Sequence, residues 1–546
     1  MKNEVFVKDF TSPGDADSAA GIREAIKYAL KNEIHTIIFE AGKYTLKSFT
    51  RIDTEGMRHD IGCVDRELYK DCHIAVLNAE NLSLIGQADE KGECKTILAG
   101  DNPGYGNVFL PAVLWCENCS HLSVKNIGFT RDPEFTSAGE VIKIDGSSVW
   151  IDVFEGNPCY DGMEVFCANR FTSERELLGE SVTYGQPIKE KFSLEGGRRL
   201  RLDSEWIAKQ LQVGELFSWH QGAQTDFQVC FRHCNNLNLN NLRTYNSNGF
   251  CMMAEGCCNI RADKVVFKPE GNRLFTGPRD AWKLFKCSGI IDINHMYIEG
   301  VRMDGQNLQN TWFSMVEKIN DREALFHCLH TSQEIEAGSF AEFYSGSDKT
   351  SIEIKEAEVI GRWDKGYLYR FKFVEPFPDF ADNKTVVTVQ CLRPEFYVCR
   401  NSTFRNIAGA GQILKTSGAY LENCRYQNTM NPGILIGSEF TVHNEGVHGS
   451  DIWIERCEFD NCGFVKRYEA DGCIGIRSEG FQGRVNKNIF IIGSTFKNSR
   501  IGINVQTCDK AVIYNCKFEK IREKVSCDSD SRAFLCDSER GITERV

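Results

Sequence analysis

Two aspartates in the polar stretch Pro278–Trp312 have the spacing of a paired catalytic site. Asp280 and Asp304 are 24 positions apart (304 − 280 = 24), close to the length of one repeating unit of this chain. If neighbouring units stack, the two carboxyl groups lie side by side. When two carboxyl groups are adjacent, the charge of one raises the pKa of the other, so that one keeps its proton while the other is ionised. Glycoside hydrolysis requires such a pair as its acid and base. The alternative is that both residues only terminate turns, as Asp often does in loops.

Several polar and aromatic side chains near this pair could bind a substrate. Trp rings stack on the C–H faces of sugars, and Arg or Lys can bind a carboxylate or sulfate group. The ordinary interpretation is a core position for each Trp and a solvated surface for each charge. The candidates are Arg279, Trp282, Lys283 and Trp312, together with Asn248 on the loop of a preceding unit.

The aspartates lie in a chain whose local pattern repeats. A short apolar strand, a polar pair that often ends in Asn or Cys, and an aromatic residue recur from Val124–Phe129 to Tyr514–Phe518. Three aromatic pairs are each 22 positions apart: Tyr245 and Phe267, Phe404 and Tyr426, and Phe496 and Phe518. Such short strands bury an apolar face only by stacking, and a propeller blade would need about 40 residues. We therefore expect an all-β fold, a right-handed parallel β-helix (solenoid) with a long groove that suits carbohydrate chains.

A helical segment and two non-repeating segments interrupt this pattern. Gly14–Lys31 has apolar side chains at helical spacing after Asp17 or Ser18, so we expect an N-terminal capping helix that covers the first coil. Two segments of alternating strands predict inserted antiparallel subdomains, β-barrel-like, that wall a pocket. The predicted organisation is cap and first coils in 1–132, an inserted β-subdomain in 133–229, coils with the site in 230–312, a second inserted β-subdomain in 313–394, coils in 395–521 and a charged tail in 522–546. The tail looks aperiodic, so it is either flexible or holds a partner subunit, as in a homodimer.

Charge and hydropathy exclude several classes of partner. The 64 basic and 76 acidic residues give a net charge of −12, which repels phosphate backbones and anionic membranes. No stretch of the sequence approaches the roughly 18 apolar residues of a membrane span. The first residues lack the basic and apolar regions of a secretory signal. We therefore expect a cytoplasmic protein with a carbohydrate substrate, and neither nucleic acid nor membrane as a partner.

The 24 cysteines favour buried thiols over disulfides. Stacked coils would align many of them in an inward ladder of small side chains, which agrees with the burial preference of free Cys. Cys116 and Cys119 form a CxxC, but no second pair or His cluster has zinc-ligand spacing. The sequence therefore predicts no metal site, no cofactor and a reducing compartment. The ladder positions are Cys234, Cys287, Cys424, Cys457 and Cys516.

Around the aspartates the chain resembles glycoside hydrolase family 110, the α-1,3-galactosidases. DAWKLFKCSG at Asp280–Gly289 matches the family's Asp-Ala and Cys-x-Gly, and MDGQNLQNT at Met303–Thr311 places Asp304 on the second Asp of its pair and Asn307 on its Asn. NEGVHGSDIWIERCEF, from residue 444 to residue 459, places Glu445 on the family's Glu. The resemblance implies an inverting exo-enzyme on a β-helix with two inserted β-barrels. Its catalytic residues would be Asp304, Asp280 and Glu445.

The chain departs from the family at two motif positions. The first Asp of the pair is Met303, and the site His is Gln309, which joins Asn307 among the substrate-binding candidates. Loss of one motif carboxylate moves an acid or base role to Asp280, to Glu445 or to a Glu from an insertion, changes the substrate, or abolishes activity.

Three function classes remain open from the sequence. The first is an exo-acting inverting glycoside hydrolase, with carboxyl groups roughly 6.5 to 9.5 Å apart to admit a water. A calcium-dependent polysaccharide lyase would need an acidic ligand cluster and a base, for which Asp280, Asp304 and Arg279 are the available residues. A non-catalytic glycan-binding β-helix is favoured by the missing Asp. Galacturonan hydrolases fit less well, because only a loose GVHG at Gly446–Gly449 matches their motifs.

Overall fold

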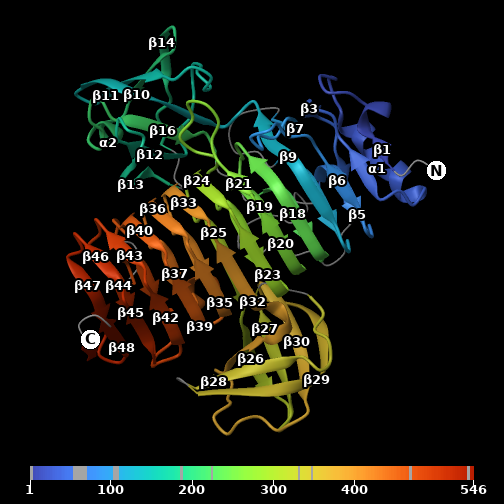
Figure 1. Cartoon of the computed structure of the whole chain (residues 1–546), viewed down its shortest axis with the longest axis vertical. Helices are drawn as coiled ribbons and strands as arrows, with labels where there is room; N and C mark the ends of the chain where they lie inside the picture. Colours follow the sequence, from blue (N-terminus) through green and yellow to red (C-terminus); the bar gives the residue numbers. More distant parts are fainter. Residues whose placement is uncertain are drawn as a thin grey trace.

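The chain is coiled into a parallel β-helix (Figure 1). The computed structural model describes residues 4–52, 71–102, 110–184, 188–222, 226–329, 333–345, 348–466, 470–537 and 542–545. Within these residues two largely parallel sheets run along the molecule, one of 23 strands and one of 13. We call the 13-stranded one the site sheet. Its consecutive strands include β17 (Phe227–Arg232), β19 (Phe250–Glu255), β22 (Trp282–Phe285), β25 (Gln306–Thr311), β34 (Gln412–Leu414) and β37 (Ile434–Ile436).

Aromatic side chains stack directly on one another along the helix axis. Phe404 pairs with Tyr426 in register, and their ring centroids are 4.9 Å apart. This distance is one strand spacing, so the predicted coil period is confirmed here. The ladder continues through Phe459, Phe496 and Phe518, with centroid separations of 4.8, 5.0 and 5.0 Å.

An asparagine at one bend of the coil explains the polar part of the repeated phrase. Asn401, Asn423 and Asn515 of the phrase have φ angles of 52°, 52° and 50°, in the left-handed region. Asn tolerates this region because its short polar side chain can form local hydrogen bonds. Asn401 Nδ2 donates to Asn294 Oδ1 at 2.9 Å, and Asn423 Nδ2 donates to Asn401 Oδ1 at 3.4 Å. The phrase therefore marks the bend between two strands of one coil.

The predicted N-terminal cap is helix α1 (Ala19–Lys31). Ile22, Ala25 and Ile26 are buried on one face of α1, and α1 lies over the first coil at the N-terminal end (Figure 1). Asp17 Oδ1 accepts a hydrogen bond from the backbone N–H of Ala19, which satisfies an N–H of the first turn. Within the described ranges, no helix is long and apolar enough to cross a membrane.

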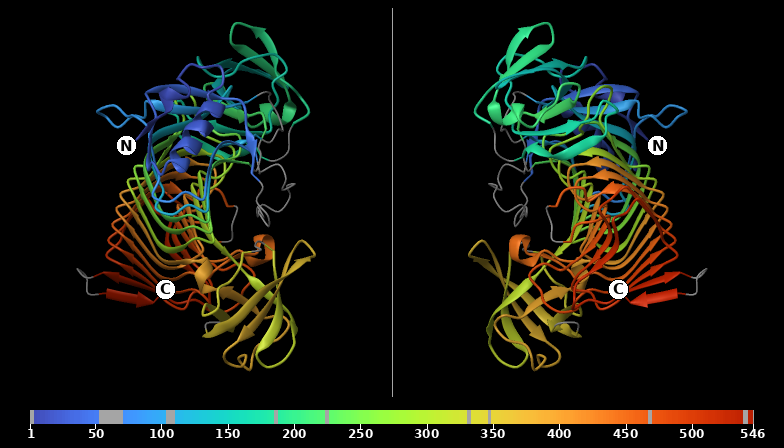
Figure 2. Two further views of the ribbon diagram at one scale, coloured as in Figure 1. Left: turned by 90° about the vertical axis from the view of Figure 1, so that its right-hand side faces the viewer. Right: turned by 90° about the vertical axis from the view of Figure 1, so that its left-hand side faces the viewer.

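Two antiparallel subdomains are inserted between coils, at opposite ends of the strands of the site sheet. The first lies between β9 (Ser123–Asp132) and the start of β17, and the second between the end of β25 and β32 (Pro394–Arg400). Because β17 and β25 run parallel, the two insertions flank the outer face of the site sheet from its two sides. Figure 2 shows the first insertion at the top of the coils and the second at the bottom.

The two insertions differ in how they close. In the described part of each, the second is a closed six-stranded barrel, whereas the first is a seven-stranded antiparallel sheet. The barrel strands are β26 (Phe313–Lys318), β27 (Glu323–Cys328), β28 (Phe340–Ser345), β29 (Asp348–Trp363), β30 (Gly366–Phe373) and β31 (Val386–Val389). The sheet strands are β10 (Thr136–Asp145), β11 (Ser148–Val153), β12 (Cys167–Phe171), β13 (Leu177–Thr183), β14 (Ser193–Gly196), β15 (Arg199–Asp203) and β16 (Leu216–His220).

The end of the chain differs from the predicted aperiodic tail over 522–546. β47 (Glu523–Cys527) pairs in parallel with β44 (Ile501–Val505) of the preceding coil. β48 (Ala533–Asp537) pairs in parallel with β45 (Ala511–Tyr514), and β49 (Ile542–Arg545) then pairs antiparallel with β48. The sequence pattern did not predict this last coil because charged side chains at its exposed positions interrupt the apolar pattern.

The described cysteines are all free thiols, and most are buried. Cys424 Sγ lies 3.9 Å from Cys399 Sγ of the adjacent coil, as the inward ladder requires. Burial raises the pKa of Cys251 to about 12, so such thiols stay protonated and unreactive at neutral pH.

We predict that thiol titration in denaturant without reductant will detect nearly all 24 cysteines. Titration of the native protein should detect far fewer, because the thiolate is the reactive species and burial suppresses it. Equal counts in the two conditions, or several disulfides found by mass spectrometry, would contradict the buried-thiol ladder.

Candidate active site

The candidate site lies on the outer face of the site sheet, between the two insertions. β22 and β25 are adjacent, with Trp282 opposite Gln306 and Lys283 opposite Asn307. Side chains alternate along a strand, so Trp282 faces the apolar core and Lys283 faces outward. The residues that precede and follow these strands build the site.

The structure brings Asp280 and Asp304 together. Each lies two positions before the first residue of its coil's strand, and the backbone N–H of Asp304 donates to Asp280 Oδ1 at 3.2 Å. Asp304 Oδ1 also accepts a hydrogen bond from the Ala410 N–H at 2.8 Å. A Cβ atom at Gly409 would lie 2.7 Å from Asp304 Oδ1, so glycine leaves the space that this carboxyl group occupies. The two side chains are only 3% and 7% exposed.

Burial and mutual repulsion hold a proton on this pair. Burial and, after it, the neighbouring charge of Asp280 together raise the pKa of Asp304 to about 8, although the hydrogen bond from the Ala410 N–H opposes them. Burial also raises the pKa of Asp280, although Lys283 opposes that shift. Near neutral pH the pair therefore holds a proton.

Glu445 has the opposite protonation state. It lies on β38 (Glu445–Gly446), which pairs antiparallel with the end of β25. Burial alone would raise its pKa, but Lys415 and then Lys283 outweigh that effect and lower the pKa to about 2. Lys283 Nζ is 3.8 Å from Glu445 Oε1, and Lys415 Nζ forms an ion pair with Glu445 Oε2. The site thus places a protonated carboxyl pair beside a cluster that contains an ionised carboxylate.

Lys415 is the centre of that cluster, and sequence reasoning missed it. Its side chain is fully buried, and its ammonium donates to Glu439 Oε2 at 2.6 Å as well as to Glu445. Lys415 immediately follows the apolar strand β34, where an aliphatic residue would be ordinary. A lysine at that point of a buried strand was the available signal.

The first insertion reaches the site through Tyr184. Arg279 NH1 donates to the Tyr184 hydroxyl at 3.1 Å and lies 3.4 Å from Met303 Sδ. Burial raises the pKa of Tyr184, and Asp280 and Asp304 add to that shift, so its hydroxyl stays protonated. Arg279 therefore lies where the chain carries Met303 instead of a carboxylate. Tyr184 was not among the predicted site residues.

Both predicted tryptophan platforms are wrong. Trp282 is fully buried in the β-helix core, near Phe267 at a centroid distance of 6.4 Å. Trp312 is also fully buried, with ring centroids 5.7 Å from Tyr344 and 5.0 Å from His448. The Trp312 indole donates to the backbone oxygen of Glu445 at 3.2 Å, so Trp312 helps to position strand β38. Spacing in the sequence did not show which way either ring points.

Three predicted amide side chains lie on or near this face. Asn307 is beside Lys283 on the outer face, and Gln309 follows two positions later. Within the described ranges, Asn307 Oδ1 and both amide atoms of Gln309 are buried without a hydrogen-bond partner. Asn248 lies farther toward the first insertion, close to His220 of β16. Buried amides of this kind are rare in proteins and are ready to bind the hydroxyl groups of a ligand.

The described part of the chain has no group of three or more His, Cys, Asp or Glu side chains that could hold a metal ion. Around Glu445 the two nearest countercharges are ammonium groups of the protein itself, Lys283 and Lys415.

Comparison with known proteins agrees with this architecture. A family model described as a right handed beta helix region matches residues 392–535. Alpha-1,3-galactosidase B of Bacteroides fragilis (strain YCH46) is 21% identical over 468 residues, which cover 78% of this chain and 73% of that protein. Alpha-1,3-galactosidase A of Bacteroides thetaiotaomicron is 22% identical over 307 residues, 52% of each chain. The tailspike protein of E. coli bacteriophage HK620 has a TM-score of 0.43 at 10% identity, covering 98% of this chain and 65% of its own. The chain is a right-handed parallel β-helix with sequence similarity to glycoside hydrolases.

We predict that Lys415→Met destabilises the fold by about 3–5 kcal/mol at pH 7, because it leaves Glu439 and Glu445, whose side chains are only 15% and 12% exposed, without their shared countercharge. Glu445 has a folded pKa lowered to about 2, so its pairing stabilises the fold above its ordinary pKa near 4.5 and is lost as the pH falls toward 2. The difference between wild type and variant should therefore be largest above pH 4.5 and shrink below it. Urea unfolding at several pH values measures this difference.

Lys209→Met is the matched control, because Lys209 forms an exposed pair with Glu205 at 2.7 Å. That variant should change stability by less than about 0.5 kcal/mol. A Lys415→Met protein as stable as the control at pH 7 would show that the buried cluster does not depend on this lysine.

Proposed function

We propose that this protein is an exo-acting, inverting glycoside hydrolase that removes a terminal, α-galactoside-like sugar from an oligo- or polysaccharide. The observation that carries the proposal is the split protonation of the buried carboxyl groups. Burial and the charge of Asp280 raise the pKa of Asp304 to about 8, while the lysines lower the pKa of Glu445 to about 2. Groups whose environments drive their pKa values apart are suited to the acid and base roles of glycoside hydrolysis.

Each group has one step in the proposed reaction. Asp304 donates its proton to the glycosidic oxygen as the bond from that oxygen to the anomeric carbon breaks. Glu445 accepts a proton from a water whose oxygen forms the new bond to the anomeric carbon on the opposite face. Asp280 accepts the Asp304 N–H and, through its charge, keeps the pKa of Asp304 high. The products are the released sugar with inverted configuration and the shortened glycan.

Burial of the site supports an exo mode of action. Asp280 and Asp304 are almost completely buried, and an inserted subdomain stands at each side of the outer face. A chain end can enter such a site more easily than the middle of a polymer. Asn307 and Gln309 supply unpaired amide atoms for the hydroxyl groups of a terminal sugar.

Sequence similarity supports the galactoside part of the proposal. The relatives are named α-1,3-galactosidases, and the similarity to the Bacteroides fragilis protein spans most of this chain. The motif matches at Asp280, Asp304, Asn307 and Glu445 support placement near glycoside hydrolase family 110. Met303, which replaces a motif Asp beside Arg279, favours one alternative, a non-catalytic glycan-binding protein.

We predict that Asp304→Asn and Glu445→Gln each lower the turnover of α-1,3-linked galactobiose by about 10²- to 10⁴-fold. The two variants should differ on 2,4-dinitrophenyl α-galactoside, whose leaving group departs without a proton. Asp304→Asn should lose much less activity on that substrate, whereas Glu445→Gln should lose as much as before. NMR of the first product should show the β-anomer of galactose.

Asp379→Asn on the exposed surface of the barrel is the control and should keep full turnover. Unaltered turnover in Asp304→Asn would refute its role as the acid. Wild-type protein that binds galactobiose without hydrolysing it would support the glycan-binding alternative, and an unsaturated product would indicate a lyase.

A further inference from the structure

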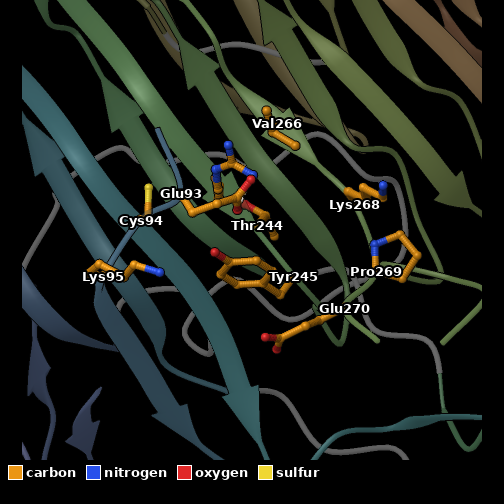
Figure 3. A pocket seen from close by; sticks show the side chains of 10 residues that line it. Glu93, Cys94, Lys95, Thr244, Tyr245, Val266, Lys268, Pro269 and Glu270 are labelled. Carbon is orange, nitrogen blue, oxygen red and sulfur yellow. Dashed lines mark ion pairs between the residues drawn. The ribbon is translucent and has the colours of Figure 1, made fainter. Parts of the chain in front are cut away.

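A groove on the 23-stranded sheet, away from the aspartate pair, consists of two adjoining cavities. Their volumes are 330 and 430 Å³, within the ~300–1,000 Å³ typical of small-molecule sites. Both cavities are lined by Cys94, Lys95, Tyr245 and Glu270, so these four residues lie where the cavities meet. Figure 3 shows Tyr245 in the middle, with Lys95 on one side and Lys268 and Pro269 on the other.

Tyr245 follows β18 (Asn235–Thr244), and the neighbouring glycine lets its ring lie against the sheet. Gly128 on β9 is in register with Ile97 and with Arg243. A Cβ atom at Gly128 would lie 2.9 Å from Cε2 of Tyr245 and 2.6 Å from Cδ1 of Ile97. Any larger residue would therefore displace the ring. Within the described ranges, the Tyr245 hydroxyl has no hydrogen-bond partner, and burial raises its pKa so that it stays a neutral donor.

The charges around the ring are already neutralised by partners. Arg243 pairs with Glu93 at 2.7 Å, and Lys95 pairs with Asp89 at 2.8 Å. Each of the six basic side chains lining the two cavities has an acidic group within 4.0 Å: Lys43, Lys95, Arg131, Arg243, Lys268 and Arg273. A sulfate or uronate would have to displace one of these acids, and the exposed carboxylate of Glu270 would repel it. The hydroxyl groups of a neutral sugar can instead bond to the paired groups without separating them.

We propose that this groove is a second carbohydrate-binding site, which takes at least two uncharged sugar units across the face of Tyr245. The aromatic face provides the stacking surface for a sugar ring, and the two adjoining cavities provide space for consecutive units. Arg273 joins the groove to the base of the first insertion, because it pairs with Glu134 and donates to the Gly156 oxygen at 3.1 Å. A glycan held here stays close to the subdomain that also borders the aspartate pair, which raises its local concentration.

The test uses the full chain carrying Asp304→Asn, titrated with α-1,3-linked galactobiose by calorimetry. Tyr245→Ala should weaken the Tyr245-dependent binding event at least about tenfold, and Tyr245→Phe should weaken it only a few-fold, because the ring remains. Tyr514→Ala is the matched control, since Tyr514 is exposed on a distant coil. Galactobiose carrying a 4-O-sulfate should bind this site more weakly than the neutral disaccharide.

Binding with two sites in the parent and one in Tyr245→Ala is the expected result. If the parent shows only one binding site and Tyr245→Ala abolishes it, the groove is also supported, because binding at the aspartate site would survive this substitution. Equal binding in Tyr245→Ala and Tyr514→Ala, or no binding of galactobiose at all, would overturn the proposal. Tighter binding of the sulfated disaccharide would overturn its assignment to neutral sugars. Melting temperatures of the variants identify any loss of folding.

Discussion

In-register stacking of coils, one strand spacing apart, is the constraint on which the rest of this structure depends. It converts a distance along the sequence into a contact in space, so that Lys283 lies beside Asn307 and Phe404 beside Tyr426. The same stacking brings the carboxyl groups of two successive coils together at Asp280 and Asp304. Each coil contributes few chemical groups, but adjacent coils build a site with residues far apart in the chain.

The site exists because the outer face of the sheet is covered at both edges. The first insertion supplies Tyr184 on one side, and on the other side Trp312 helps to position strand β38, which carries Glu445. This cover excludes water from the site, and a carboxyl group without water around it either keeps its proton or needs a positively charged partner. Asp304 represents the first outcome and Glu445, with Lys415 and Lys283, the second. One physical cause, burial, thus produces two opposite protonation states.

The sequence predicted the features that depend on the spacing of residues, but not those that depend on the direction in which a side chain points. The 22-residue spacing of aromatic residues predicted the coils, and the 24-residue spacing of the aspartates predicted their contact. Trp282 was misplaced because Ala281 and Trp282 are consecutive and both buried, so simple alternation fails at the bend that enters β22. Lys415 was missed because its partners Glu439 and Glu445 lie 24 and 30 positions later in the sequence, so the local signal was limited to a lysine beside an apolar strand. The last coil was missed because charged residues occupy its outer positions.

The dependence of kcat/KM on pH tests the central claim most directly, because it reports the protonation of the free enzyme. The substrate should be α-1,3-linked galactobiose, whose poor leaving group requires the acid. We predict an alkaline limb with an apparent pKa near 8, set by the coupled pair Asp280 and Asp304, since activity is lost when Asp304 loses its proton. Activity should persist well below pH 6, because Glu445 stays ionised. An alkaline limb at an ordinary carboxyl pKa near 4, or activity unchanged to pH 10, would contradict the account.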